Sequence, residues 1–418
     1  MTSGGMPAKR ILILFVIAHT LLAVDRSIMA VMLEPIRNEF ALSDTQLGFL
    51  TGIGFALFFG LAGLPLGWMV DRFNRRNILA ASVGVFSVMT AAAAATGTFV
   101  QLLITRLLVG AGEAGGGPAM LSMISDLYPP NKRASAVATY YAGAPIGAML
   151  ILFAGGWIAS EYGWRVAFLI AGLPGMLLAI VLLTIPEPTR QGGAVGQAAP
   201  TAAPFREVLA FIWSQRSACH LLITATITSA ATAGLFSFTI SYLVRVQGVS
   251  LATAGMMMAV GYGVMGLLST SVSGRIVDRL AKRDERWRPW FCAICCALSA
   301  PAVAIMVATP SLLFVGIGLA LWAAFSVATY GPLMALLQSL VKSRMRGTVS
   351  AIFYILSYFV GVSVGPQFVG YFSDLFTQML GWDALGLALL AVSAFYLWGA
   401  VHFVLAARTV RSDLAVAA

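Results

Sequence analysis

Long apolar segments recur along the whole chain, and each is about as long as a helix must be to cross a lipid bilayer. About 20 residues span the ~30 Å of hydrocarbon, and segments of this length follow one another from residue 11 to residue 406. Hydrophobic residues make up 59% of the chain and charged residues only 10%, against about a quarter charged in a soluble domain. The sequence therefore predicts an all-α integral membrane protein with many spans.

The predicted spans fall into two sets of six. The stretch from Pro186 to Ala203 is rich in Pro, Gly and Ala and indicates a linker, and "FREVLAFIWSQR" after it indicates a short amphipathic helix at the membrane surface. We expect an N-terminal six-helix bundle over 1–185, a cytoplasmic linker over 186–216 and a C-terminal six-helix bundle over 217–418. The spans are 11–33, 46–70, 78–98, 100–123, 135–159, 165–185, 218–244, 252–276, 290–309, 312–337, 348–372 and 384–406.

The positive charge of the chain lies in alternate loops. The formal net charge is +10, and 21 of the 26 Lys and Arg residues fall in the two terminal segments and in the loops after even-numbered spans. Loops that stay in the cytoplasm are the ones enriched in Lys and Arg. We therefore expect a multi-pass protein of the cell (inner) membrane with both termini cytoplasmic. The same placement of the charge argues against binding to nucleic acid.

The two halves of the chain repeat each other. A G-x-x-x-D-R motif follows the second and the eighth span, and a Gly-Trp pair precedes the sixth and the twelfth. Parallel six-span repeats, related by an axis along the membrane normal, are one of the architectures of secondary transporters. The repeated motifs are Gly67-x-x-x-Asp71-Arg72 with Gly274-x-x-x-Asp278-Arg279, and Gly163-Trp164 with Gly381-Trp382.

Three motifs resemble those of the major facilitator superfamily. "GWMVDRFNRRN" at 67–77 is similar to its loop signature G-x-x-x-D-R-x-x-R-R, with Asn74 where a glycine is usual. "RLLVGAGEAGGGPA" at 106–119 is similar to the R-x-x-x-G motif of its fourth helix, and "GAPIGAMLILFAGG" at 143–156 to its Gly/Pro-rich fifth helix. The resemblance implies twelve transmembrane helices in two pseudo-symmetric bundles and transport by alternating access.

A narrower resemblance involves the N-terminal half. "VDRSIMAVMLEPIRNEFALSDTQLGFLTG" at 24–52, together with "GAGEAGGGPA" in the fourth span, resembles the spinster branch of the superfamily, particularly its bacterial members. Animal members of that branch move sphingosine-1-phosphate and lysophospholipids. The resemblance therefore implies an amphipathic lipid substrate, and it implies an Asp-Arg pair in helix one that works with an Arg and a Glu in helix four.

Four charged residues lie well inside predicted spans, and all belong to the first half. Each charge costs roughly 2.5–3.5 kcal/mol at the centre of a bilayer by insertion scales. Two carboxylates and two guanidinium groups sum to zero, which indicates a mutually compensating cluster rather than four isolated penalties. These residues, named the charge quartet from here on, are Asp25, Arg26, Arg106 and Glu113.

Helix geometry limits how the quartet can pair. Adjacent residues point about 100° apart, so Asp25 and Arg26 cannot neutralise each other well. Arg106 and Glu113 are seven residues apart and share one face, about 10 Å apart along the axis, so each is expected to meet a partner from the first span at its own level. Asp25 with Arg106 and Arg26 with Glu113 is one pairing, and the crossed pairing stays open.

The quartet has two interpretations. It could lock the first and fourth spans together, although an apolar interface of small residues would do so at a lower desolvation cost. We favour the second, in which Asp25 and Glu113 are the proton-coupling groups and Arg26 and Arg106 bind the substrate headgroup or act in gating, because protonation leaves the quartet with one positive charge and Arg suits phosphate. Which carboxylate titrates stays open. His19 is either a packing residue or a proton relay.

The repeated loop motifs indicate a cytoplasmic gate. Gly67 and Gly274 would permit close helix approach, and Asp71 or Asp278 would face the positive N-terminal end of a helix of the other half. Neighbouring arginines would bind carboxylates or anionic lipid. A plain basic loop that only sets the orientation is the alternative. The predicted gate residues are Gly67, Asp71, Arg72, Arg76, Gly274, Asp278 and Arg279.

The spans of the second half carry no acidic residue but many aromatic residues and methionines. A cavity that is charged on one wall and apolar on the other suits a lipid with one headgroup and one tail. We expect Tyr330, Tyr354 and Tyr358 among its lining residues.

The predicted function is proton-coupled secondary active transport. The chain has no G-x-x-x-x-G-K-[ST] phosphate loop for an ATP motor. A membrane enzyme would need a catalytic constellation that the three dispersed histidines and the arginine-matched carboxylates do not form, so we do not expect an enzyme. The substrate is predicted to be a lysophospholipid or a lipid like sphingosine-1-phosphate, and the alternative is an organic-anion or drug/proton exchanger. We expect no cofactor and no bound metal, protons and membrane lipids as partners, and a monomer.

Overall fold

The structure is a computed structural model and describes residues 6–190 and 203–417. Within these two ranges every regular element is a helix. Eleven stretches of the described chain are long and apolar enough to cross a membrane. The remaining expected span, 100–123, is present as α5 (Phe99–Glu113) and α6 (Gly116–Leu127), separated by a turn at Ala114 and Gly115. The all-α membrane fold expected from the sequence is confirmed.

The helices form two compact units, which are described one at a time. Unit 1 contains residues 1–42, 53–192 and 249–259, and unit 2 contains residues 43–52, 193–248 and 260–418. The helices of unit 1, besides α5 and α6, are α1 (Ala8–Phe40), α3 (Ile53–Arg72), α4 (Arg75–Ala93), α7 (Pro130–Tyr141), α8 (Gly143–Tyr162), α9 (Trp164–Leu182) and α12 (Leu251–Met258).

Unit 2 contains two short π-helical segments, η1 (Ala259–Val264, which begins at the unit boundary) and η3 (Ile355–Val362), and a 3₁₀ turn, η2 (Ser343–Met345). Its α-helices are α2 (Asp44–Thr51), α10 (Phe205–Ser214), α11 (Arg216–Arg245), α13 (Met265–Ala281), α14 (Trp287–Val307), α15 (Leu312–Ala328), α16 (Tyr330–Ser339), α17 (Arg346–Tyr354), α18 (Ser363–Leu380) and α19 (Leu385–Ala417).

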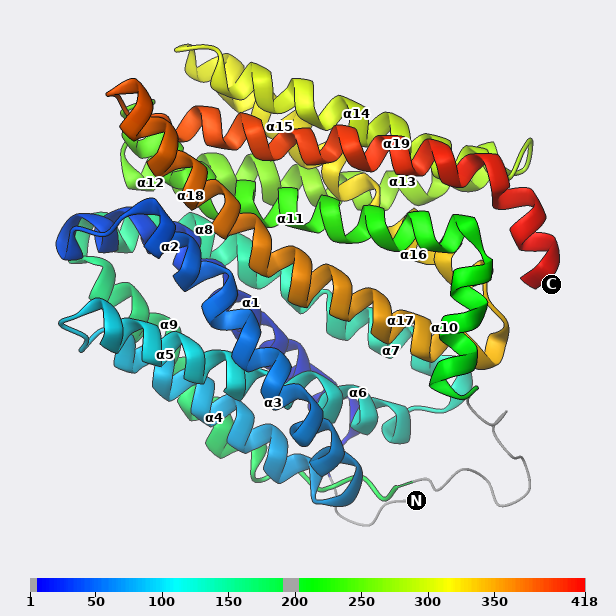
Figure 1. Cartoon of the computed structure of the whole chain (residues 1–418). Coiled ribbons are helices and arrows are strands. Elements are labelled where there is room, and N and C mark those ends of the chain that lie inside the picture. The colour runs from blue at the N-terminus through cyan, green and yellow to red at the C-terminus, as the bar shows by residue number, and fades with distance from the viewer. Residues whose placement is uncertain (1–5, 191–202, 418) are drawn as a thin grey trace. The chain divides into compact units, whose positions relative to one another are not determined.

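The core of unit 1 is an apolar cluster between α1, α4, α6, α7 and α9. Phe15, Leu79, Met120, Ile124 and Leu182 have no exposed surface in it. Figure 1 shows α4, α5 and α9 running side by side, and α1 packs along α8. This packing fixes α1 and α5, the two helices that carry the charge quartet.

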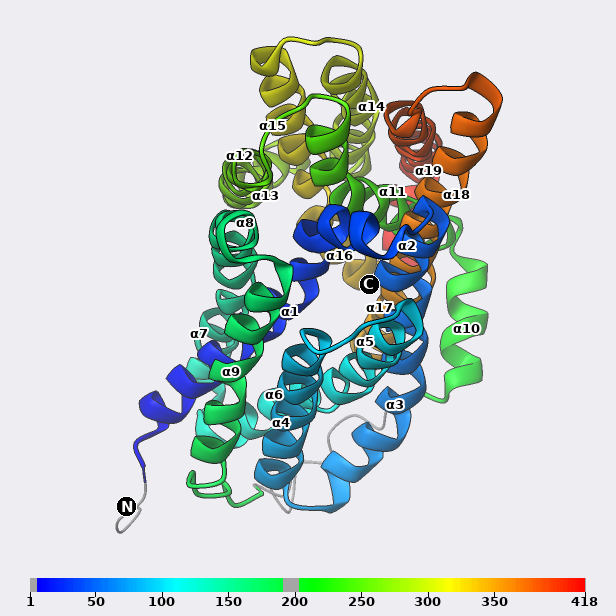
Figure 2. The ribbon, with the colours of Figure 1, turned by 90° about the vertical axis from the view of Figure 1, so that its left-hand side faces the viewer.

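The core of unit 2 contains a polar contact as well as apolar packing. Trp322 on α15 is fully buried, and its Nε1 donates a hydrogen bond of 2.9 Å to the hydroxyl of Tyr396 on α19. Thr232 on α11 lies 2.8 Å from the same hydroxyl. Buried polar groups need such partners, and these hydrogen bonds hold α11, α15 and α19 in register. Figure 2 shows the short helix α10 as a separate segment beside α17.

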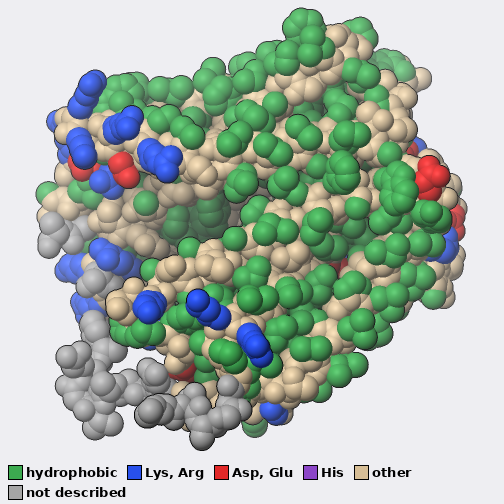
Figure 3. Space-filling model, turned by 180° about the vertical axis from the view of Figure 1, so that it is seen from behind, with side chains coloured by type: hydrophobic (Ala, Val, Ile, Leu, Met, Phe, Trp, Pro, Cys, Tyr) green, Lys and Arg blue, Asp and Glu red, His purple; other side chains and the backbone are tan. Residues whose placement is uncertain are grey.

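Large apolar side chains cover the outer flanks of the helices. Leu64 is 82% exposed, Leu313 69% and Leu177 67%, which a soluble protein avoids over so wide a surface. Figure 3 shows one face on which hydrophobic side chains cover the flanks while Lys and Arg side chains gather towards helix ends. This surface fits helices that are surrounded by lipid tails.

The predicted repeat has a counterpart in the backbone. Gly163 before α9 has φ of 83° and Gly381 before α19 has φ of 74°, a conformation that L residues with a Cβ adopt only at a cost. Both Gly-Trp pairs therefore place a positive-φ glycine at a helix end, but ψ is 158° at Gly163 and 11° at Gly381, so the chain turns differently at the two points. Their tryptophans differ, because Trp164 is buried and Trp382 is exposed.

We predict that Gly147 on α8 is required for the packing of α8 against α1. A Cβ at this position would collide with the carbonyl oxygen of Thr20 on α1. Gly147→Ala should therefore destabilise the protein by about 1–3 kcal/mol through overpacking. The measurement is thermal unfolding of the purified protein in detergent.

Gly63 on α3 is the matched control, because a Cβ there would meet nothing. Gly63→Ala should leave the melting temperature unchanged or raise it slightly, since Ala is the better helix former. Equal melting temperatures for the two variants would contradict the close contact between α1 and α8.

Candidate functional site

The charge quartet forms two ion pairs between α1 and α5. Arg26 Nε lies 2.6 Å from Glu113 Oε2. Arg106 Nη1 and Nη2 lie 3.4 and 3.3 Å from the two oxygens of Asp25. Of the two pairings that helix geometry left open, the structure contains Asp25 with Arg106 and Arg26 with Glu113.

The four side chains differ sharply in exposure. The side chains of Asp25, Arg106 and Glu113 are 3%, 2% and 0% exposed, whereas that of Arg26 is 32% exposed. One guanidinium group of the quartet can therefore be reached from outside the protein core while its carboxylate partner cannot. A guanidinium group that binds a substrate must be accessible to that substrate, and here its carboxylate counter-ion stays buried.

The two carboxylates also differ in their hydrogen bonds. Asp25 accepts from both terminal nitrogens of Arg106 and from the hydroxyl of Thr90 on α4. Glu113 accepts from Arg26 through Oε2, and its Oε1 has no hydrogen-bond partner among the described residues. Asp25 is thus well satisfied, and Glu113 keeps one oxygen that could carry a proton.

Aromatic side chains of α3 border the accessible arginine. The guanidinium carbon of Arg26 lies 5.3 Å from the ring centre of Phe59 and 5.9 Å from that of Phe55. Such contacts stabilise a cation by about 0.5–2 kcal/mol without neutralising it. Arg26 therefore combines a charge, a bidentate donor geometry and an apolar border, which suits an anionic group attached to an apolar body.

Comparison with known proteins decides the family. The family model described as Major Facilitator Superfamily matches residues 15–366. The chain belongs to the major facilitator superfamily. Its fold and family are those of transporters, so the expected twelve-helix facilitator fold is confirmed and transport across a membrane is its general activity.

Individual relatives in the superfamily carry different names. An "MFS-type efflux pump" of Mycolicibacterium smegmatis is 33% identical over 401 residues, covering 94% of this chain and 91% of that protein. The sphingosine-1-phosphate transporter of Mus musculus is 26% identical over 420 residues, covering 94% of this chain and 76% of that protein. A solved bacterial homologue of the human lysosomal transporter spinster, described as inward-facing and unoccupied, is 27% identical with a TM-score of 0.89, covering 97% of this chain and 98% of that one. The expected resemblance to the spinster branch is confirmed.

His19 lies in a packing environment. Its Nδ1 is 3.0 Å from the carbonyl oxygen of Tyr140 on α7, and its ring stacks on the Tyr140 ring with centres 4.3 Å apart. These contacts account for the imidazole without a proton path. The relay role stays a prediction that no contact described here supports.

The first predicted gate motif lies at the end of α3 and at the loop after it. Asp71 and Arg72 are exposed, and Arg72 stacks over the ring of Trp68 at 4.3 Å. A Cβ on Gly67 would meet nothing, and the same holds for Gly274. No described atom lies close to either glycine, so their role in close helix approach stays a prediction.

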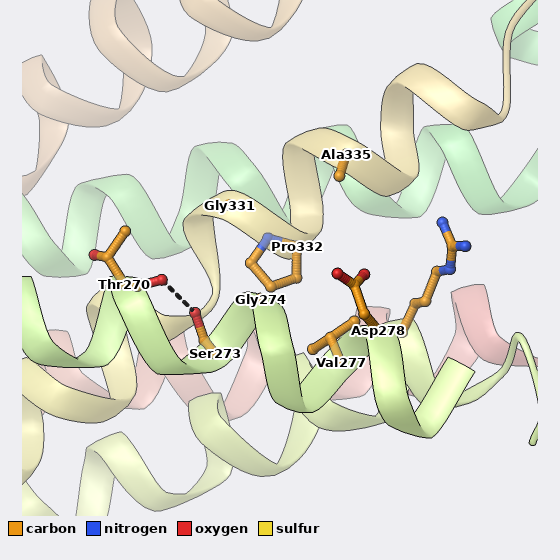
Figure 4. A pocket seen from close by; sticks show the side chains of 9 residues that line it. Thr270, Ser273, Gly274, Val277, Asp278, Gly331, Pro332 and Ala335 are labelled. Atoms are coloured by element: carbon orange, nitrogen blue, oxygen red, sulfur yellow. Dashed lines mark hydrogen bonds between the residues drawn. The ribbon is translucent and has the colours of Figure 1, made fainter. Parts of the chain in front are cut away.

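The second motif lines a pocket of about 210 Å³ within unit 2. Figure 4 shows the Asp278 carboxylate pointing from α13 towards α16, where Ala335 lies. Arg288 from α14 also lines this pocket. The open space beside Gly274 is this pocket.

Arg75, rather than Arg72 or Arg76, is the buried arginine of the first motif. Its side chain is 2% exposed and forms ion pairs with Asp126 on α6 and, at 2.9 Å, with Glu187. The backbone amide of Arg76 also donates to Glu187, at 2.9 Å. The start of the predicted linker is thus fixed to unit 1 by its carboxylate, which the Pro/Gly/Ala composition of the linker did not indicate.

Arg190 fixes the same linker start to the end of α3. Its guanidinium donates to the carbonyl oxygens of Val70, Asp71 and Phe73. The last carbonyls of a helix lack intrahelical partners, and a cation suits this negative end. The loop after α3 is therefore held from two sides, by Glu187 and by Arg190.

The three tyrosines expected to line a cavity are half exposed. Tyr330 is 46% exposed, and Tyr354 and Tyr358 are each 42% exposed. The rings of Tyr330 and Tyr354 both pack against Phe353. Neither pocket described in unit 2 is lined by any of the three, so their lining role stays a prediction.

One close pair of titratable residues could not be found from the sequence. His220 on α11 and His402 on α19 have their Nδ1 atoms 2.9 Å apart. They lie 182 residues apart in the chain, and no motif links them. The packing of α11 against α19 brings them together.

We predict that the Asp25–Arg106 ion pair stabilises the fold and that removing one of its charges destabilises the protein more than removing both. Asp25→Asn should cost about 3–5 kcal/mol, because it leaves a buried guanidinium without its counter-ion. The double variant Asp25→Asn with Arg106→Gln should be more stable than the single variant, since neither charge then stays unmatched. Thermal unfolding in detergent measures both, and an equally unstable or less stable double variant would contradict the pairing.

We predict that Glu187 stabilises the protein only while it is ionised. Burial raises the pKa of Glu187, but hydrogen bonds from the Arg76 amide and from Arg75 outweigh burial and hold that pKa below its ordinary value. A lowered folded pKa gives a stabilisation that is complete above the unfolded pKa of about 4.3 and is lost as the pH falls through the folded pKa.

Glu187→Gln should therefore melt below the unchanged protein at about pH 7, and the difference should shrink at about pH 3. Thermal unfolding monitored by tryptophan fluorescence at both pH values gives the comparison. A difference that stays constant between them would show that the carboxylate charge is not what stabilises the linker.

Proposed function

We propose that this facilitator is a proton-coupled secondary active transporter in which Glu113 takes up the proton and Arg26 binds an anionic headgroup. The observation that supports this most directly is the Arg26–Glu113 pair at 2.6 Å, in which the guanidinium is 32% exposed and the carboxylate is 0% exposed. A reachable cation with a buried counter-ion can exchange that counter-ion for a substrate. Membership of the superfamily accounts for transport, and we attribute the coupling of transport to protons to the Arg26–Glu113 pair.

The hydrogen bonds that the two carboxylates accept favour Glu113 over Asp25 as the proton site. Protonating Asp25 would weaken the bonds that it accepts from Arg106 and Thr90. Protonating Glu113 at Oε1 removes no hydrogen bond, because that atom has no partner among the described residues. Charge-assisted hydrogen bonds contribute about 1.5–3 kcal/mol each, so the proton is less costly on Glu113.

Proton and substrate binding are then coupled through Arg26. While Glu113 is ionised, it holds the guanidinium and competes with any anion. When Glu113 is protonated, Arg26 loses the ion pair with that carboxylate in a region where charges are costly. An anionic group that binds the guanidinium removes this penalty, so each ligand strengthens the binding of the other.

The proposed substrate is an amphipathic anionic or zwitterionic lipid, such as a lysophospholipid or a lipid like sphingosine-1-phosphate. Support comes from the spinster-like relatives and from Phe55 and Phe59 beside Arg26, which would suit a headgroup close to an apolar chain. The alternative is an organic-anion or drug/proton exchanger. The relative at 33% identity, named an efflux pump, supports that alternative.

The transport cycle is proposed to be alternating access between a bundle over 1–185 and a bundle over 217–418, joined by the linker 186–216. We propose that both termini and the linker are cytoplasmic, because Lys and Arg are concentrated in these segments and in the loops after even-numbered spans. In this scheme the two G-x-x-x-D-R motifs act at the cytoplasmic side, with Asp71 and Asp278 as their gating carboxylates. The protein is proposed to work as a monomer.

We predict that a fluorescent lysophosphatidate binds the purified protein more tightly as the pH falls from about 8 to about 6. Glu113→Gln imitates the protonated state, so this variant should bind with the acidic affinity at both pH values. Equilibrium binding measured by fluorescence anisotropy in detergent gives both curves. Persistence of the full pH dependence in Glu113→Gln would contradict Glu113 as the proton site.

Glu39→Gln is the control for the loss of a carboxylate from a neighbouring helix. Glu39 lies at the end of α1, is 40% exposed and pairs with Arg165 rather than with the quartet. This variant should keep the pH dependence of the unchanged protein. If it loses that dependence, a general charge effect explains the result.

We further predict that the apolar chain of the substrate contributes to binding. Sphingosine-1-phosphate should bind more tightly than inorganic phosphate and benzoate, and Arg26→Gln should weaken its binding by about tenfold or more. Competition with the fluorescent lysophosphatidate measures each affinity. Benzoate binding as tight as the lipid would favour the organic-anion exchanger, and undiminished binding to Arg26→Gln would contradict Arg26 as the headgroup site.

A further inference from the structure

Two histidines that the proposed transport mechanism does not use face each other in unit 2. His220 lies on α11 and His402 on α19, and their Nδ1 atoms are 2.9 Å apart. The two ring centres are 5.1 Å apart, with an angle of 52° between the ring planes. Both side chains are half-buried. These two residues are named the histidine pair from here on.

The short contact between the two Nδ1 atoms requires one hydrogen between them. One ring must carry a proton on Nδ1 and donate it, and the other must keep its lone pair and accept. This is possible when both rings are neutral. It is also possible when one ring is protonated on both nitrogens, and the hydrogen bond is then charge-assisted and stronger. When both rings are fully protonated, two N–H groups face each other and no hydrogen bond remains.

Hydrogen bonds at Ser217 hold α11 to α19 on the linker side of the histidine pair. The backbone amide of Ser217 donates to the Asp413 carboxylate at 2.8 Å. The Ser217 hydroxyl donates to the carbonyl oxygen of Ala406 at 3.1 Å and lies 2.8 Å from the hydroxyl of Thr409. The first amides of a helix lack intrahelical partners, and a carboxylate suits this positive end. The start of α11 is therefore fixed to the last turns of α19.

Close packing holds the same two helices together on the other side of the histidine pair. The Thr224 hydroxyl donates to the carbonyl oxygen of Gly399 at 3.3 Å. A Cβ on Gly399 would lie 2.8 Å from Cγ2 of Thr228. Figure 1 shows α11 and α19 running side by side. The histidine pair is thus enclosed between two sets of contacts, and two charged rings can separate only by turning away or by breaking the contacts of Ser217.

No carboxylate forms an ion pair or a hydrogen bond with either imidazole within residues 6–190 and 203–417. The charged group that acts on His220 is Arg216, one turn earlier on α11, and the group that acts on His402 is His220 itself. Carboxylates on the neighbouring elements are already engaged by other groups, and η3 contributes only the hydroxyl of Tyr358. They are Asp413 with the Ser217 amide, Glu207 of α10 with Arg344, and Asp284 before α14 with Arg411.

The proton number of such a pair changes near neutral pH. The ordinary pKa of an imidazole is about 6.5, and two groups this close titrate in two steps that belong to the pair. Separated rings each accept an extra proton, whereas the hydrogen-bonded rings hold only one between them. The separated state therefore binds one proton more, so acid favours separation and neutral pH favours the contact.

We propose that the histidine pair is a pH-dependent contact that joins the start of α11 to the end of α19 near neutral pH and releases it in acid. The first extra proton strengthens the hydrogen bond, and the second breaks it and places two positive charges beside Arg216. Because α11 directly follows the linker and α10, release loosens the end of unit 2 at which the linker enters. This end is the proposed cytoplasmic one, so the histidine pair responds to cytoplasmic pH.

This proposal is independent of the proposed proton site. Glu113 belongs to unit 1 and the histidine pair to unit 2, and the measurements below contain no substrate. A wrong assignment of Glu113 would leave the release of α11 by acid unchanged. Failure of the histidine pair would leave the binding predictions for Glu113 and Arg26 unchanged.

The first measurement is a double-variant cycle of His220→Leu and His402→Leu in the full-length protein in detergent. Melting temperatures of the unchanged protein, both single variants and the double variant, at about pH 7.5 and about pH 5.5, give the interaction between the two side chains. This interaction should be stabilising at the higher pH and destabilising at the lower. An interaction of the same sign at both pH values, or none at either, would overturn the proposal.

Hydrogen–deuterium exchange of the unchanged protein locates the effect and needs no variant to fold. After correction for the chemical exchange rate, peptides from the start of α11 and the end of α19 should exchange about threefold faster or more at about pH 5.5 than at about pH 7.5. Peptides from α4 and α9 in unit 1 should not change. Equal corrected rates at both pH values, or the same acceleration in unit 1, would contradict a local release by acid.

Asp413→Asn is the matched control, because it weakens the attachment of the same end of α11 without removing an imidazole. This variant should melt below the unchanged protein at both pH values and should keep the faster exchange at the lower pH. His402→Leu should lose that difference between the two pH values. If Asp413→Asn loses it instead, the carboxylate cap and not the histidine pair senses the proton.

Discussion

The cost of a charge inside a membrane is the constraint on which the functional part of this structure depends. A carboxylate or guanidinium within the hydrocarbon must be matched at its own depth, and the pairs Asp25–Arg106 and Arg26–Glu113 satisfy this requirement between α1 and α5. The pairs are not equivalent, because only Arg26 is substantially exposed. One pair is closed and suits a structural role, and the other contains a cation that an anion can reach, which suits the coupling of protons to transport.

The features that could be predicted from the sequence are those that depend on local residue pattern and on the matching of opposite charges. Apolar segments of membrane-spanning length predicted the fold, and the match in number of mid-span charges predicted the quartet, although two pairings stayed open. Contacts that depend on packing between distant helices could not be predicted. His220 with His402 and Arg75 with Glu187 have no local signal, because each pair is separated by more than a hundred residues. The role given to Gly67 stays a prediction, because a glycine in a motif does not show whether another helix lies beside it.

Proton uptake upon substrate binding tests the central claim most directly. Titration of sphingosine-1-phosphate into the purified protein, in two buffers of different ionisation enthalpy near neutral pH, gives the number of protons taken up per molecule bound. We predict net uptake of a proton by the unchanged protein and none by Glu113→Gln. Binding of the lipid without proton uptake, or equal uptake by both proteins, would contradict the coupling of Glu113 to Arg26.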